Sequence, residues 1–202
     1  MILDSQYFPP VIVFKKIITS THVEIEQYES FRKGTFRNRC MISGGNGIMS
    51  LTVPILGGRT QKLAIKDIQI DYSESWQRAH SRGLATSYSK SPFYHYYKPE
   101  IEKLIFSDTP YLFDLNQRIL EAMVRLLKIK VEIARTSEYI KEYEGVPDYR
   151  NKPSTRDFQS DPENTTLPYA QVFQDRFGFQ PNLSILDLLF CEGPNASSFL
   201  RG

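Results

Sequence analysis

The spacing of apolar residues changes twice near the start of the chain. A short apolar run at 1–3 is followed by two prolines and then by apolar residues at helical spacing, which predicts a helix over about 10–19. Over 23–28, Val23 and Ile25 alternate with acidic residues, a period of two that predicts a strand. Strand, helix and strand in this order predict a parallel βαβ unit.

A β-hairpin is predicted next. Met41 and Ile42 precede the glycine-rich stretch GGNG at 44–47, and apolar residues alternate after it at 51, 53 and 55. The glycines tolerate the positive φ that a tight turn between two strands requires. Residues 64–71 return to a period of two, the pattern of a strand, with Ile68 and Ile70 on one face.

Helical spacing dominates the middle of the chain. A helix is predicted over 74–89 with Ser73 as its N-cap, and its apolar stripe recurs every four residues: Trp76, His80, Leu84 and Tyr88. In the next helical stretch, Pro99 is expected to open a segment of its own. A third helix, over 110–127, is expected to be capped by Thr109 and carries the clearest apolar face of the chain.

The chain then loses regular patterning. After a short predicted strand at 130–134, residues 142–168 hold four prolines and few aliphatic residues. Prolines remove backbone donors, and a polar segment buries too little apolar surface to fold into a regular element. We therefore predict an irregular proline-rich surface loop over 142–168.

The stretch PNLSILDLLFCEGP predicts a helix over 184–192 that is apolar nearly all round and therefore buried. Gly193 permits a left-handed exit, and Pro194 prevents continuation. The whole pattern predicts a single α/β domain over 1–202. We expect a mixed sheet with a βαβ start and a β-hairpin, and helices packed on it.

Composition narrows the class of protein. The 202 residues are 41% hydrophobic, enough for one sizeable core, and 25 Lys+Arg stand against 23 Asp+Glu. This balance argues against a nucleic-acid binder, which concentrates positive charge on one face. No run approaches the roughly 20 apolar residues of a membrane span, and no signal-peptide pattern is present. We expect a cytoplasmic protein in which Cys40 and Cys191 are reduced, buried thiols.

A basic segment offers the first candidate chemistry. Arg37, Asn38 and Arg39 precede the predicted hairpin, with Arg32 and Lys33 just upstream. One interpretation is a solvated basic turn. The other is an anion clamp, in which two guanidinium forks hold a phosphate or carboxylate and Asn38 hydrogen-bonds backbone or ligand.

His80 shares its helix stripe with aromatic residues. It is either a partly buried histidine packed among them or a proton donor and acceptor in a cleft lined by Trp76 and Tyr88. His22 and His95 lie in other predicted elements, so the spacing supports no metal site. GGNG lacks the Lys-Ser/Thr of a phosphate-binding loop, and we predict no cofactor.

The last predicted helix carries a carboxylate near its start. Asn182 or Ser184 is expected to cap it, and Asp187 follows Ser184 at the spacing of a capping box. For Asp187, a capping role is favoured over a catalytic one, because an acid in the first turn complements the helix dipole. No G-x-S-x-G motif surrounds Ser184, which argues against a nucleophile.

Several motifs together resemble the WbqC-like family. They occur in family order and span most of the chain: YFPP (7–10), FRNRC (36–40), LTVP (51–54), Trp76-x-x-x-His80, SPFYHYY (91–97) and PNLSILDLLFCEGP (181–194). The family consists of bacterial proteins associated with surface-polysaccharide (O-antigen) gene clusters, and the resemblance implies transfer of an amino-acyl (glycine) group. Where many members carry His-Gln-Pro before the first motif, this chain has Leu3, Asp4 and Ser5.

The residues and the resemblance predict a transferase that acts on a small molecule, an activated sugar or its amino-acid donor. His80 and Asp187 are the catalytic candidates. The substrate-binding candidates are Tyr7, Arg37, Asn38, Arg39, Trp76, Tyr88, Asn182 and Ser184. The alternative is a non-catalytic binding or assembly protein of the same pathway, which the absence of a recognisable nucleophile, metal set or phosphate loop favours.

Overall fold

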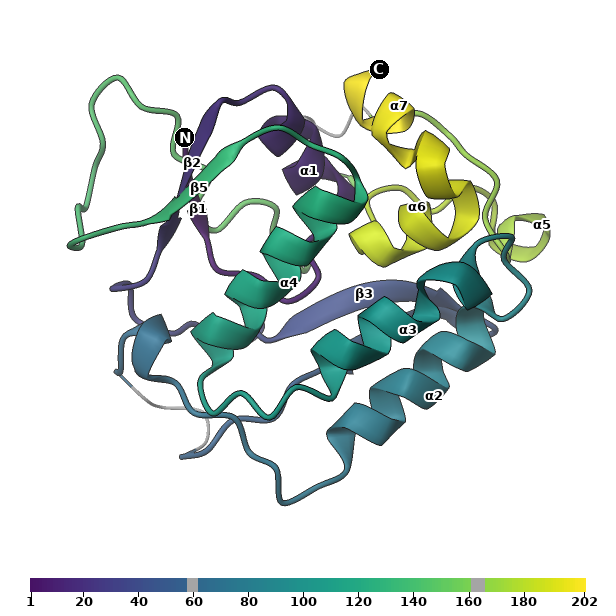
Figure 1. The fold of residues 1–202 in the computed structure, drawn as a ribbon, viewed down its shortest axis with the longest axis horizontal. Helices are drawn as coiled ribbons and strands as arrows, with labels where there is room; N and C mark the ends of the chain where they lie inside the picture. The colour runs from purple at the N-terminus through teal and green to yellow at the C-terminus, as the bar shows by residue number, and fades with distance from the viewer. Residues whose placement is uncertain (58–61, 161–165) are drawn as a thin grey trace.

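A computed structural model describes residues 1–57, 62–160 and 166–202 (Figure 1). Three parallel strands form one sheet in the order β1 (Ile2–Asp4), β2 (His22–Glu26) and β5 (Glu132–Arg135). Helix α1 (Val11–Ile18) joins β1 to β2, which confirms the predicted βαβ start. The sheet and the helices packed around it confirm the α/β class.

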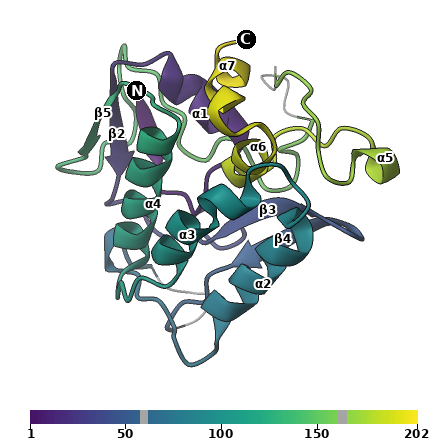
Figure 2. The ribbon, with the colours of Figure 1, turned by 45° about the vertical axis from the view of Figure 1, so that its right-hand side comes forward.

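The predicted hairpin is also present. Strands β3 (Arg39–Gly44) and β4 (Gly47–Thr52) pair antiparallel and form a second sheet of two strands. Gly47 has a φ of +105°, the conformation for which the glycine-rich turn was expected. Helix α2 (Trp76–Tyr88) packs across both strands of this hairpin (Figure 2).

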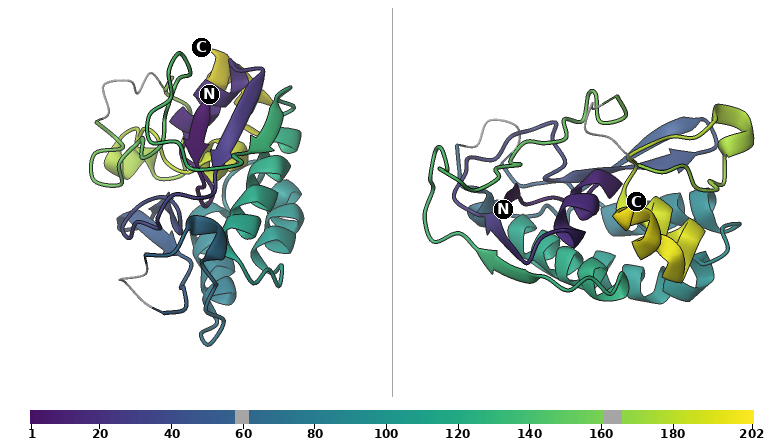
Figure 3. Two further views of the ribbon diagram at one scale, coloured as in Figure 1. Left: turned by 90° about the vertical axis from the view of Figure 1, so that its left-hand side faces the viewer. Right: turned by 90° about the horizontal axis from the view of Figure 1, so that it is seen from above.

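Three helices lie along one side of the molecule: α2, α3 (Tyr94–Ile105) and α4 (Leu112–Leu126), with α3 packed between its neighbours (Figure 3). Trp76, His80, Leu84 and Tyr88, which were predicted to form one stripe of α2, are all buried. The N-caps predicted for α2 and α4, Ser73 and Thr109, were wrong. The N-cap positions are Ser75 and Tyr111, and neither side chain caps its helix.

The predictions for Pro99 and for residues 64–71 also differ from the structure. Pro99 lies inside α3 rather than opening a new segment. Proline has no N–H, so the bond to the carbonyl of His95 one turn earlier is absent, and the helix continues without it. The expected strand over 64–71 is a single 3-10 turn, η2 (Ile65–Asp67), followed by isolated bridges. The bridges of this segment pair with three different parts of the chain, at Ser30, Ile55 and Tyr111, so no continuous strand pairing forms.

The predicted C-terminal helix is α6 (Ile185–Glu192), and its residues 185–190 are fully enclosed. Ser184 caps it as expected, since the Ser184 hydroxyl accepts a hydrogen bond from the Leu186 N–H at 3.3 Å. Gly193 follows with a φ of +53°. The chain does not end its helical structure there: η3 (Gly193–Asn195) leads into α7 (Ala196–Arg201), which packs on α1.

The proline-rich segment contains no helix or strand over the described parts of 142–168, and residues 161–165 lie outside the described residues. It is nevertheless tied into the protein. The Ile2 N–H donates to the Pro147 carbonyl, and the Tyr149 N–H donates to the Ile2 carbonyl, so the loop covers the outer edge of β1. Phe158 is buried. Beyond the loop, the short helix α5 (Gln174–Phe177) precedes α6.

Both cysteines are free and buried, as predicted. Within the described residues, no helix is both long and apolar enough to cross a membrane.

Candidate functional site

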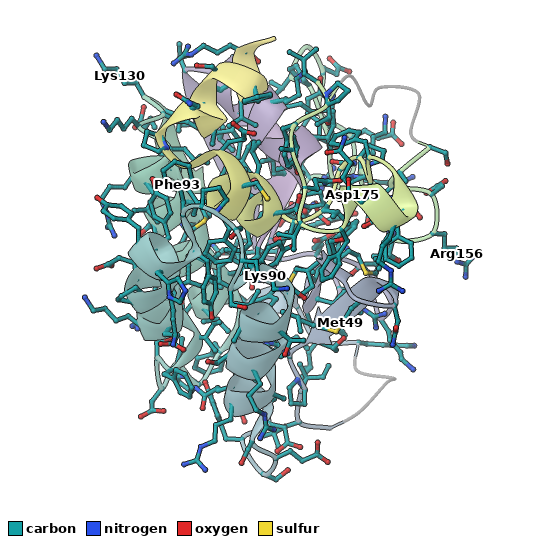
Figure 4. The ribbon with its side chains drawn as sticks, turned by 90° about the vertical axis from the view of Figure 1, so that its right-hand side faces the viewer. Met49, Lys90, Phe93, Lys130, Arg156 and Asp175 are labelled. Carbon is teal, nitrogen blue, oxygen red and sulfur yellow. The ribbon has the colours of Figure 1, made fainter. Side chains whose placement is uncertain are left out.

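A basic pocket of about 280 Å³ opens near the carboxyl end of β1. Two loops form it, residues 32–37 after β2 and residues 151–156 of the proline-rich segment. Arg32, Lys33 and Arg156 are exposed along it, whereas Asp4 and Arg37 are buried. Figure 4 shows the Arg156 side chain extending away from the body of the molecule. Ligands of open α/β sheets commonly bind at the carboxyl ends of the strands, as this pocket would allow.

The two loops hold each other in place. Gly34 has a φ of +78°, which lets the first loop turn back, and its carbonyl accepts a hydrogen bond from the Thr155 hydroxyl of the second. The rings of Phe36 and Phe158 meet edge to face with their centroids 5.9 Å apart, over Leu183. These contacts join segments more than a hundred positions apart in the sequence and make the pocket walls part of the folded core.

Arg37 lies at the centre of a buried ion cluster. Its side chain is 0% exposed, its Nε donates to Glu29 at 2.8 Å, and its Nη1 lies 3.1 Å from an Asp4 carboxylate oxygen. Its Nη2 also donates to Asn151 at 2.9 Å. A guanidinium out of water needs such partners. The arrangement does not fit the predicted anion clamp or the solvated turn, because Arg37 already holds two protein carboxylates.

The pKa of Glu29, which belongs to this cluster, is raised from 4.5 to about 7. Burial is the largest cause, the Arg37 charge opposes it, and the carboxylates of Asp4 and Glu26 add to it. Asp4 and Glu29 are both paired with the single guanidinium of Arg37 in the interior. Glu26 has its own partner, since Arg150 of the proline-rich segment lies 3.2 Å from it.

The neighbours of Arg37 have different roles. The Asn38 side-chain amide donates to the Val53 carbonyl at 2.8 Å and so ties the start of β3 to the segment that follows β4. Arg39 is half-buried in β3 and does not line the basic pocket. Of the predicted clamp residues, only Arg37 reaches the pocket.

His80 is 4% exposed between α2 and the hairpin, where it and Trp76 line a pocket of about 430 Å³. Its Nε2 donates to the Thr52 carbonyl at 3.1 Å, which leaves Nδ1 to accept a hydrogen bond from the Tyr7 hydroxyl at 2.9 Å. The Trp76 ring lies edge-on, 5.1 Å from the imidazole centroid. Burial lowers the pKa of His80 to about 4, so the ring is neutral at pH 7. With both nitrogens engaged, His80 fits the packed-histidine interpretation better than the proton-transfer one.

Asp187 is also enclosed, and its predicted capping role was wrong. Its carboxylate accepts hydrogen bonds from the hydroxyls of Tyr88 at 2.8 Å and Tyr169 at 2.7 Å, and from the Gln171 amide at 2.8 Å. Burial raises the pKa of Asp187, and these three donors partly offset the rise. The carboxylate connects α2, α6 and the segment between the proline-rich loop and α5.

Asn182 and Ser184 also have structural partners. The Asn182 side-chain oxygen accepts from the Ile12 N–H at 2.8 Å, so it caps α1 rather than α6. The Ser184 hydroxyl donates to the Phe8 carbonyl at 2.9 Å. Through these bonds the segment before α6 closes the N-terminal end of α1.

The predicted site residues therefore separate into three groups, around Arg37, around His80 with Tyr7 and Trp76, and around Asp187 with Tyr88. Sequence reasoning missed Asp4 and Arg156 as pocket residues. Asp4 had a signal, because it is a carboxylate at the end of an apolar strand; Arg156 had none within the irregular segment. Among the described residues, no three His, Cys, Asp or Glu side chains are placed to hold a metal ion.

Comparison with known proteins gives one family and one relative. The profile described as "WbqC-like protein family" matches residues 4–199. The chain is also similar to an uncharacterized protein, Rv1507c, of Mycobacterium tuberculosis, with 26% identity over an alignment that covers 99% of this chain and 96% of the relative. No solved structure gives a significant match.

Proposed function

The chain belongs to the WbqC-like protein family, and from this premise we propose that it is a transferase of surface-polysaccharide biosynthesis that binds an anionic small molecule in the basic pocket. The ligand is an activated sugar or an amino-acid donor, and the group transferred is an amino-acyl unit such as glycine. The proposed place of action is the cytoplasm.

The observation that supports this proposal is the gathering of Arg32, Lys33 and Arg156 around one space of about 280 Å³. Guanidinium forks bind phosphate or carboxylate oxygens through pairs of N–H groups, and an ammonium adds a point charge. Arg37 and Asp4 pair with each other beneath, so the Arg37 charge is engaged inside the protein, and Arg32 and Arg156 are the exposed guanidinium groups of the lining.

A second candidate function is binding without catalysis in the same pathway. The observation that favours it is the engagement of both catalytic candidates. His80 uses both ring nitrogens inside the protein, and the Asp187 carboxylate accepts from three buried donors. Neither group is in the basic pocket.

Thermal unfolding with nucleotide-activated sugars and with amino acids tests ligand binding. A ligand that binds only the native state stabilises it by about 2.7 kcal/mol at a hundred times Kd. We expect Arg156→Ala to lose this stabilisation. Arg125→Ala, which removes an exposed arginine on α4 away from the pocket, is the matched control and should keep it. Stabilisation by none of these ligands, or an equal response from Arg156→Ala, would contradict the proposal.

Mass spectrometry of mixtures that contain a stabilising ligand separates the two functions. A mass increase of the acceptor equal to the amino-acyl unit, dependent on the protein, supports the transferase. Binding without any product supports the non-catalytic alternative.

A further inference from the structure

A buried group of three charged side chains adjoins the basic pocket. Asp4 and Arg37 are part of the pocket lining, and Glu29 is attached to them through the Arg37 guanidinium. The Nε and Nη2 of Arg37 donate to the two carboxylate oxygens of Glu29 at 2.8 and 2.6 Å, and Nη1 lies 3.1 Å from an Asp4 oxygen. All three residues are buried, so water screens their charges only weakly.

When both acids are ionised, this group has two negative charges and one positive charge. The charged groups that act on Glu29 are Arg37, Asp4 and Glu26, and Glu26 is itself paired with Arg150 at 3.2 Å. The excess negative charge therefore stays with the acids around Arg37. It lies next to the space in which we propose that an anion binds, and it repels such a ligand.

A single proton removes this excess. When Glu29 is neutral, the Arg37 guanidinium faces one carboxylate, that of Asp4, and the group has no net charge. Protonation of Glu29 takes place near neutral pH, because burial raises the pKa of this carboxyl group to about 7. A bound anion favours the neutral form of Glu29, and the neutral form in turn favours the anion, so the two equilibria are linked.

We propose that an anion binding in the basic pocket takes up a proton from solvent, and that the Glu29 carboxyl group holds this proton until the anion leaves. This inference rests on the anion site of the proposed function and adds a dependence on pH to it. The pocket therefore holds an anion more tightly at pH 6 than at pH 8.

Isothermal titration calorimetry with sodium sulfate tests the proposal. Sulfate keeps its double negative charge between pH 6 and pH 8, so the ligand itself takes up no proton. We expect sulfate to bind the wild type about fivefold more tightly at pH 6 than at pH 8. The heats of binding at pH 7 in two amine buffers of different ionisation enthalpy give the number of protons taken up. We expect about 0.4 proton for each sulfate bound.

Three variants assign the effect to residues. Glu29→Gln keeps the shape of the side chain but cannot ionise, so we expect equal affinity at the two pH values and no proton uptake. Glu100→Gln removes an acid of α3 that pairs with Lys103 away from the pocket, and it should behave as the wild type does. Arg156→Ala removes a guanidinium of the lining and should weaken sulfate binding at both pH values.

The results separate this inference from the proposed function. Sulfate binding that depends on Arg156 but is equally tight at pH 6 and pH 8 would overturn the proton uptake and leave the anion site in place. The same holds for a wild-type pH dependence in Glu29→Gln. Absence of sulfate binding at both pH values would refute the anion site and this inference with it. If Glu29→Gln does not fold, zero proton uptake by the wild type still overturns the proposal.

Discussion

Replacing Arg37 with methionine tests whether this arginine supports the fold or binds a ligand. In the structure its guanidinium is 0% exposed and contacts two carboxylates, with nitrogen-to-oxygen distances of 2.6 Å to Glu29 and 3.1 Å to Asp4. It also donates to Asn151 at 2.9 Å. Methionine has a similar length and no charge, so Arg37→Met leaves both acids in the interior without the cation that pairs with them.

The cost follows from this uncompensated charge. Removing one partner of a buried ion pair typically destabilises a protein by about 3–5 kcal/mol. For a chain of this size, 1 kcal/mol corresponds to about 2–4 °C in Tm. We therefore expect a Tm about 6–20 °C below that of the wild type at pH 8. At pH 5 the loss should be smaller, because the pKa of Glu29 is already raised to about 7 and its carboxyl group is protonated there in both proteins.

Urea unfolding at pH 5 and pH 8 measures both effects. Arg125→Met is the matched control, because Arg125 is exposed on α4 and makes no ion pair with a described residue. It should change stability by less than about 0.5 kcal/mol. Loss of a buried ion-pair partner should lower the free energy of unfolding by several kcal/mol. A decrease of less than about 1 kcal/mol for Arg37→Met would therefore refute the structural role of Arg37. So would an equal loss at the two pH values.

Two further predictions concern buried acids. Below pH 4.5 the raised pKa of Glu29 contributes its full stabilisation, and this contribution is lost as the pH rises through about 7. This contribution amounts to about 3 kcal/mol. The urea midpoint of Glu29→Gln should therefore fall less between pH 5 and pH 8 than that of the wild type. Equal falls in the two proteins would contradict the raised pKa of Glu29. Asp187→Asn places an amide donor against the hydroxyl of Tyr88, the hydroxyl of Tyr169 or the amide of Gln171, which are donors themselves. We expect the free energy of unfolding in urea to fall by about 1–3 kcal/mol. No change would mean that the carboxylate faces solvent.

Elements with strong local signals could be predicted from the sequence. The glycines at 44–47 led to the right hairpin, and the apolar face of 110–127 to α4. Ser184 caps α6 as its position suggested. The strand predicted over 64–71 is absent because a period of two shows only which side chains are buried. Such a period fits a paired strand and also fits an extended segment that makes only isolated bridges. Ile68 and Ile70 are indeed buried, but no strand partner runs beside them.

The candidate site was predicted less well, and the reason is the same for each residue. A sequence shows that Arg37 has a guanidinium and that His80 has a titratable ring, but not which groups surround them. Arg37 meets Asn151 across 114 positions, and His80 meets Tyr7 across 73. Once such partners are present, the charge or proton that a ligand would need is already used inside the protein.

By itself, the sequence determined most of the helices and strands, their buried faces and the family, because periodicity and motifs depend on residues close together in the chain. Only the tertiary structure decided that Arg32, Lys33 and Arg156 line one pocket, and that Arg37, His80 and Asp187 have their partners inside the protein. Burial makes an unpaired charge or acceptor costly, so the function of a polar side chain depends on partners that come together only when the chain folds.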